Sequence, residues 1–312
     1  ENSILTEKTP IKLFWDNGNG LSFEREISID SDYMFTIIQK VENTSAGSME
    51  LIPYGMVVRE GEPKNLMNFF ILHEGLIRMS DGELSEESYG NLQDYEINTN
   101  ENGNPRAERK EVIKDGWIGF TDHFWMTSLI PQPGTAFRST AKYYEARDIY
   151  QAEVVLPKVS ISEGQTAQIT TQFFAGAKEW DAIQKYEKQG VKGFIDSIDW
   201  GWFFFLTKPI FIVLHWLNNV IGNMGWAIIG LTLLIKALLF PLAYKSYVSM
   251  AKMKELQPEM ARLILELEIP IKIGFQSKIS DKLYSLIIQK SDSGFFENNY
   301  HTIEKILGLS EN

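Results

Sequence analysis

The sequence predicts a mixed fold: a mainly β domain built as an antiparallel sandwich, then an amphipathic interfacial helix, then one transmembrane α-helix. Three observations predict this order. Residues 1–177 alternate short β-forming runs with turn signals. Residues 200–221 are apolar apart from one narrow polar stripe. Residues 225–243 are apolar over a length that can cross a bilayer.

The β domain is predicted from runs of β-branched and aromatic residues that partly alternate with polar ones. Clusters of Gly, Asn, Pro and Ser between the runs signal turns. Because little helical pattern separates the runs, we expect the strands to pack as an antiparallel sandwich. The predicted strands are 11–15, 35–41, 48–52, 152–156 and 168–174, and the predicted turns are 16–20, 43–47, 102–105 and 162–164.

The pattern changes period after the β domain. Trp180, Ile183, Tyr186 and Val191 recur at helical spacing among Lys, Glu and Gln residues. This spacing predicts a helical connector over residues 178–199.

Residues 200–221 carry Lys208, His215 and Asn219 on one stripe of a helix and aromatic or aliphatic residues elsewhere. Such a helix, rich in Trp, is typical of the membrane interface. Pro209 is expected in its first turn, where proline is tolerated. A second membrane span is the competing interpretation, although Lys208, His215 and Pro209 weaken it.

Residues 225–243 form the predicted membrane span. At about 1.5 Å of rise per residue the run covers roughly 29 Å, close to one hydrocarbon thickness. The basic residues Lys245, Lys252, Lys254 and Arg262 follow it. We therefore expect the C-terminal side in the cytoplasm and the β domain outside.

Composition excludes several function classes. A net charge of −11 argues against nucleic acid as a partner. The absence of cysteine excludes disulfides and thiolate sites, and the histidines form no His-x-x-x-His pair, so a zinc site is not expected. The chain opens on Glu-Asn-Ser-Ile, and we expect that a removed signal or anchor preceded it.

Lys236 is the candidate functional residue of the span. It lies about 16 Å along the helix axis from Gly225, where a cation costs about 2.5–3.5 kcal/mol at mid-helix. Thr232 is four residues earlier and shares its face. Either the long side chain reaches the cytoplasmic headgroups, or it faces a wet cavity in a helix bundle. Both interpretations stay open on physical grounds alone.

Motifs around these residues resemble the YidC family of bacterial membrane protein insertases in order, spacing and flanks. The resemblance covers about residues 1–260. In the apolar part it is carried by 201–205 (GWFFF), Pro209, 222–226 (GNMGW), 232–236 (TLLIK), 240–242 (FPL) and 249–258 (SMAKMKELQP). In the soluble part it is carried by 116–125 (GWIGFTDHFW), 129–131 (LIP) and 173–179 (FFAGAKE).

The resemblance implies a periplasmic β-supersandwich domain, similar in fold to sugar mutarotases, at residues 1–177. It implies that 200–221 is the interfacial helix and 225–243 the first span of the insertase core. Lys236 takes the place of a basic groove residue that is commonly Arg, and Thr232 that of a polar residue of the same groove. The groove opens to the cytoplasm and to lipid.

The implied function is that of an insertase or chaperone for integral membrane proteins, which makes and breaks no bond and uses no cofactor. The implied partners are nascent membrane proteins, membrane lipid and the Sec translocon. The implied location is the bacterial inner membrane, with the large domain periplasmic and the C-terminus cytoplasmic.

The resemblance ends after about Arg262. Residues 244–262 match the start of a cytoplasmic helical region, whereas 263–312 form a divergent tail without an apolar run that could span. Residues 281–290 predict a short soluble helix. A groove needs several walls and this chain offers one, so we expect a truncated or frameshifted, incomplete copy.

Two other functions compete. A membrane-tethered carbohydrate-binding or mutarotase-like domain is the alternative, in which His123 with Asp122 and His73 with Glu74 act as acid–base pairs. The third interpretation is a scaffold that recruits partners through its outer domain. Fold alone does not carry function, and no spacing rule brings these polar residues together.

Overall fold

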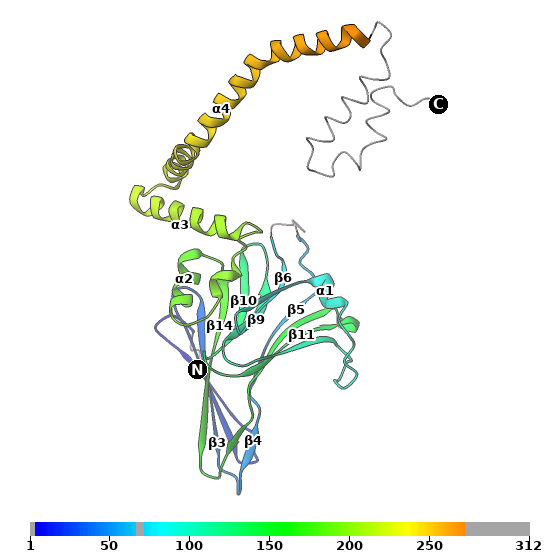
Figure 1. Ribbon diagram of the computed structural model, residues 1–312. Coiled ribbons are helices and arrows are strands. Elements are labelled where there is room, and N and C mark those ends of the chain that lie inside the picture. Colours follow the sequence, from blue (N-terminus) through cyan, green and yellow to red (C-terminus); the bar gives the residue numbers. More distant parts are fainter. Residues whose placement is uncertain (1–3, 67–71, 272–312) are drawn as a thin grey trace, which may run out of the picture. The chain divides into compact units, whose positions relative to one another are not determined.

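The computed structural model describes residues 4–66 and 72–271, with side chains up to residue 258. The chain divides into two compact units, Glu1–Phe211 and Ile212–Asn312. The described strands all belong to the first unit, and helix α3 runs from the first unit into the second (Figure 1). The helices are α1 (Tyr89–Gln93), α2 (Trp180–Lys188), α3 (Phe204–Ile221) and α4 (Met224–Ile271), with 3₁₀ turns η1 (Glu145–Arg147) and η2 (Phe194–Ser197).

The β domain contains three antiparallel sheets. The largest has the order β1-β2-β3-β14-β10-β9-β6-β7, the second β5-β12-β11-β8, and the smallest β13-β4. The strands are β1 (Ile11–Asp16), β2 (Leu21–Ile29), β3 (Met34–Asn43), β4 (Met49–Leu51), β5 (Tyr54–Glu60), β6 (Gly75–Ser80), β7 (Glu83–Ser88), β8 (Arg106–Val112), β9 (Gly116–Thr121), β10 (Trp125–Pro131), β11 (Phe137–Tyr144), β12 (Ile149–Val155), β13 (Val159–Ile161) and β14 (Thr166–Ala177).

Two hydrophobic cores lie on opposite faces of the eight-stranded sheet. The first is shared with the four-stranded sheet and joins Leu76 and Ile118 to Tyr150. The second lies beneath α2 and η2 and joins Ile77 and Trp117 to their side chains. Because neighbouring residues of β6 and β9 point into different cores, these two strands are buried along nearly their whole length. The β domain therefore has three layers: sheet, sheet and helix.

The glycines of the 116–125 motif allow neighbouring strands to approach closely. A Cβ on Gly119 would lie 1.8 Å from the Thr127 carbonyl oxygen of β10, and one on Gly116 would lie 2.4 Å from that of Met79 on β6. Between them, Trp117 is fully buried and donates its indole N–H to the Lys192 carbonyl at 3.1 Å. This part of the motif thus has a packing role.

Helix α2 is held on the sheet by both apolar and polar contacts. Ile183 and Tyr186 are buried in the second core. The Tyr186 hydroxyl donates to Asp30 at 2.8 Å, and Lys185 forms an ion pair with the same carboxylate at 3.4 Å. Asp30 also accepts the backbone N–H of Met34 at 2.9 Å, so one carboxylate fixes the β2–β3 turn and the helix together.

The two C-terminal helices are long and apolar enough to cross a membrane, over Phe204–Ile221 and within Met224–Pro258. Length and composition therefore do not separate an interfacial α3 from a spanning one, and the interfacial position stays a prediction. Gly222, at a φ of 74°, ends α3, and the Asn223 side chain caps α4 by accepting the Trp226 N–H at 3.2 Å.

The structure confirms the predicted mainly β domain followed by apolar helices, and each predicted strand lies within or across an observed one. The expectation for Pro209 is wrong, because α3 begins already at Phe204 and contains the proline. Thr207 stabilises this earlier start, since its hydroxyl donates to the Trp200 carbonyl at 2.7 Å. The predicted helix at 281–290, and the tail beyond Ile271, lie outside the described residues.

Candidate functional site

The two residues singled out in the sequence share one face of α4. Thr232 and Lys236 are both exposed. They are one helical turn apart, so their side chains follow the same stripe. The Thr232 hydroxyl donates to the Ile228 carbonyl at 2.8 Å, which satisfies it within the helix.

The opposite face of α4 packs on the C-terminal half of α3. Ala227 is fully buried, and a Cβ added to Gly230 would lie 3.9 Å from the side chains of Leu217 and Ile221. At about 100° per residue, Lys236 lies roughly 180° around the helix from Ala227. The helix therefore turns its small residues toward α3 and its cationic stripe away from it.

Lys236 has an unusual electrostatic position. Among the described residues no ion pair involves Lys236, and its immediate neighbours on α4 are Ile235 and Ala237. At the depth of a bilayer, a cation without a carboxylate partner attracts negative or polar groups strongly, because little dielectric screening separates them. The stripe can bind such groups, but it contains no pair of groups suited to proton transfer.

Lys208, the first residue of the polar stripe predicted for α3, contacts the β domain. Lys208 pairs with Asp196 of η2 and lies 5.6 Å from the ring centre of Trp200. His215 also has an interaction partner. Lys208 therefore joins the start of α3 to the β domain, which sequence periodicity could not show because Asp196 lies outside the helix.

The candidate acid–base pairs of the β domain are not brought together as pairs. Asp122 accepts a hydrogen bond from Tyr89 at 3.0 Å and pairs with Arg59 at 2.9 Å, while the His123 ring packs edge-on against Phe124. Burial and then the Asp122 charge raise the pKa of Tyr89, which keeps its hydroxyl protonated. These contacts give Asp122 a structural role.

The other proposed pair is His73 with Glu74, and His73 makes contacts outside this pair. A ring nitrogen of His73 lies 2.8 Å from the Leu76 carbonyl oxygen, and the His73 backbone N–H donates to Asp199 at 3.3 Å. Glu74 also takes part in an interaction. No group of three or more metal-ligating side chains occurs in the described part of the chain.

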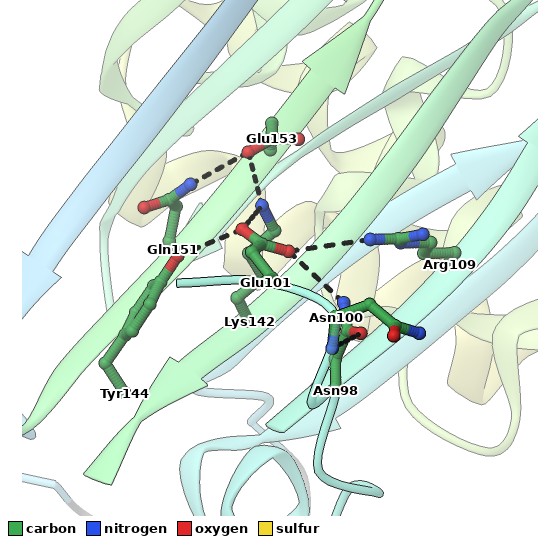
Figure 2. Close-up of polar contacts among 8 residues, drawn as sticks. All are labelled: Asn98, Asn100, Glu101, Arg109, Lys142, Tyr144, Gln151 and Glu153. Carbon is green, nitrogen blue, oxygen red and sulfur yellow. Dashed lines mark hydrogen bonds and ion pairs between the residues drawn. The ribbon is translucent and has the colours of Figure 1, made fainter. Parts of the chain in front are cut away.

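One buried charge cluster was missed by sequence reasoning. Lys142 of β11, only 5% exposed, lies between Glu101 at 2.5 Å and Glu153 at 2.6 Å (Figure 2). Burial lowers the pKa of Lys142, but its hydrogen bonds to the two carboxylates outweigh burial and leave the pKa raised. Glu101 also pairs with Arg109 at 3.5 Å and accepts from Tyr144 at 3.2 Å.

This cluster attaches the loop between α1 and β8 to the outer face of the four-stranded sheet (Figure 2). Glu101 and Lys142 are 41 residues apart, and neither has a local motif. The only signal in the sequence is a lysine within the strand-forming run of β11, which by itself indicates no partner.

Comparison with known proteins identifies similar chains. The family model described as the YidC periplasmic domain matches residues 1–213, and the one described as 60Kd inner membrane protein matches 216–266. A membrane protein insertase YidC from Ruegeria sp. (strain TM1040) is 61% identical over 261 residues, covering 84% of this chain and 43% of that protein. One from Roseobacter denitrificans is 59% identical over 263 residues, covering 84% and 43%.

Some solved structures match part of the chain at low sequence identity. A galactose mutarotase related enzyme from Lactobacillus acidophilus is 10% identical, with a TM-score of 0.38, over 56% of this chain and 69% of that one. A likeness at this level carries no argument about function. The chain spans less than half the length, 43%, of the curated relatives that it matches.

Proposed function

The chain belongs to the family of YidC membrane protein insertases, and we propose that it takes part in inserting and folding integral membrane proteins without catalysing a reaction. The observation that carries the proposal is Lys236, a cation on an apolar helix with no partner among the described residues. The chain matches only part of the length of its relatives. We therefore propose the activity for α4 together with the other helices that complete the groove.

The proposed mechanism is electrostatic. An acidic or polar segment of an entering chain loses water when it reaches the depth of the bilayer, and this loss costs several kcal/mol for each unpaired group, as an order of magnitude. Lys236 offers such a segment a charge partner, and Thr232 offers it a hydroxyl acceptor. The cost of crossing falls, while the apolar remainder of the segment passes into lipid.

A groove requires walls besides α4. The stripe of Thr232 and Lys236 faces away from α3, so α3 cannot form the wall opposite them. We place further membrane helices on that side. Lys in place of the more common Arg keeps the charge and loses the planar fork of donors, and we expect the role to survive.

The proposed orientation puts the β domain in the periplasm and the C-terminal end of α4 in the cytoplasm. Lys245, Lys252 and Lys254 support it, because basic residues that flank a span favour the cytoplasmic side. Residues 200–221 then lie at the periplasmic interface. Nascent membrane proteins are the proposed clients, and the Sec translocon is a proposed partner of the outer domain.

A complementation experiment tests the proposal. The chain is produced in cells depleted of their own insertase, as wild type and as the variants Lys236→Glu, Lys236→Arg and Lys252→Glu. Relative to the wild-type chain, we expect equal growth with Lys236→Arg and Lys252→Glu and loss of growth with Lys236→Glu. Growth of Lys236→Glu at the wild-type rate would contradict the groove role, whereas failure of all four chains would show that this chain does not act by itself.

A further inference from the structure

The tip between β9 and β10 exposes two large aromatic side chains. Phe124 and Trp125 are each 64% exposed, although Trp125 is the first residue of a paired strand. Neither belongs to either hydrophobic core. In a domain that buries Trp117 completely, this exposure needs a reason.

This tip lies at the end of the β domain where α3 begins (Figure 1). Trp125 pairs with Ala177, and the Phe124 carbonyl accepts the Lys178 N–H at 2.9 Å. The chain then enters α2, whose first residue Trp180 packs 5.5 Å from Trp200 and 4.9 Å from Phe211, centre to centre. The tip, the connector and the first half of α3 thus belong to one packed body.

The start of α3 adds a second exposed apolar group at the same end. Trp202 is 93% exposed, and the apolar residues after it are also exposed without a break up to Leu206. These residues lead directly into the two helices that are apolar enough to cross a membrane. The set of exposed residues is Phe124, Trp125, Trp202, Phe203, Phe204, Phe205 and Leu206.

Three charged side chains at this end are neutralised by neighbours within the domain. Asp122 at the tip pairs with Arg59, Lys178 pairs with Asp199 at 3.5 Å, and Lys208 pairs with Asp196. A surface whose cations and anions are already paired loses less hydration energy on contact with a bilayer than one with free charges. The end is therefore suited to the headgroup layer.

We propose that the β9–β10 tip is a second membrane contact of the β domain, which places Phe124 and Trp125 in the headgroup layer beside the start of α3. Amphipathic aromatic rings favour this depth of a bilayer. The occupant of the surface is phospholipid because the same packed body continues into apolar helices. The contact fixes the domain at two points and limits its rotation about the start of α3.

The chain offers a matched control for this proposal. Trp15 of β1 is 62% exposed, nearly the same as Trp125. Through Phe23 and Val41 it is aligned with Ala167 of β14, ten residues before the Ala177 that pairs with Trp125. At about 3.3 Å per residue the two tryptophans are separated by roughly 33 Å along the sheet.

The test uses the absence of native cysteine. The full chain is made as Trp125→Cys, Phe124→Cys and Trp15→Cys, labelled with a nitroxide and reconstituted in phosphatidylglycerol–phosphatidylethanolamine vesicles. Collision rates are measured with oxygen, which partitions into lipid, and with a water-soluble nickel chelate. A thermal unfolding midpoint equal to that of the unsubstituted chain shows that each labelled variant is folded.

We expect the ratio of oxygen to nickel collisions to be several-fold higher at positions 124 and 125 than at position 15. Equal, water-like ratios at all three positions would overturn the proposal. Protection of positions 124 and 125 from both reagents would also overturn it, since it would show that protein and not lipid covers the tip. The experiment does not depend on insertase activity, so its outcome is separate from that of the proposed function.

Discussion

The two units of the chain differ in whether their tryptophans are buried or exposed. In the β domain, Trp117 is fully buried between the sheet and η2, where it meets Phe194 edge-on at 5.4 Å. In the helical unit, Trp216 and Trp226 are about 60% exposed, at 59% and 64%, with most of the leucines of α4. A soluble domain is stabilised by burying such surface, whereas a membrane helix leaves it for lipid.

The two units also differ in the surroundings of their lysines. In the β domain a buried cation such as Lys142 is surrounded by carboxylates and serves the fold. In the helical unit Lys236 has no such partner among the described residues. Lys142 therefore serves the fold, whereas we propose that Lys236 serves a ligand.

Substitution of the buried Trp117 is expected to have the largest effect on stability. Trp117→Ala removes a buried ring and the hydrogen bond to the Lys192 carbonyl. We expect it to destabilise the β domain by about 3–5 kcal/mol, as is typical of a large aromatic core residue. Chemical unfolding of the detergent-solubilised chain, followed by circular dichroism of the β domain, measures the change.

Trp226→Ala is the matched control, because Trp226 is exposed in the helical unit. It should change the same unfolding transition by less than about 0.5 kcal/mol. Equal losses of stability from the two substitutions would show that the units do not bury apolar surface differently.

A smaller effect is expected at the buried cation. Lys142→Met leaves Glu101 and Glu153 without their shared partner. We expect a loss of roughly 2–3 kcal/mol, less than for fully buried pairs, because both carboxylates reach solvent. Lys12→Met, which removes an exposed lysine that also pairs with two glutamates, should leave the unfolding midpoint unchanged. Equal shifts in the two variants would contradict a special role for burial.

The smallest expected effect concerns acid. Burial alone raises the pKa of Asp30, but hydrogen bonds from the Met34 N–H and Tyr186 outweigh it and lower the pKa. The stabilisation is therefore complete above the ordinary aspartate value of about 3.9 and is lost as the pH falls through the lowered folded-state value.

Asp30→Asn should accordingly weaken the dependence of the unfolding midpoint on pH below about pH 4. Tyr186→Phe should weaken it in part, since it removes one of the hydrogen bonds. Melting curves between pH 3 and pH 6, on the order of the range in which carboxylates titrate, provide the measurement. An unchanged acid limb in Asp30→Asn would show that the carboxylate does not hold α2.

Much of the β domain could be predicted because strands and turns are local. The run at 168–174 was visible as β-forming, and β14 contains it. Its place between β3 and β10 was not visible, because sheet order depends on pairing between distant segments. The second core was also hidden, since β6 and β9 face two cores and lack simple alternation.

At the candidate site, too, local features could be predicted from the sequence and contacts between distant segments could not. Lys236 could be found because a charge within an apolar run is conspicuous in sequence, and its face relative to Thr232 follows from helical spacing. The pairing of Lys208 with Asp196, and of Lys142 with Glu101, could not be found because each joins separate elements. The groove role of Lys236 stays a prediction.

Access of water to position 236 tests whether the Lys236 face of α4 lies in an aqueous groove. Lys236→Cys is compared with Leu238→Cys, which lies at nearly the same depth but about 160° around the helix. Both are made in the full chain in inner-membrane vesicles and treated with a membrane-impermeant maleimide from the cytoplasmic side. We predict rapid labelling at position 236 and little at position 238. Equally slow labelling at both positions would mean that the Lys236 face lies against acyl chains, which contradicts the account.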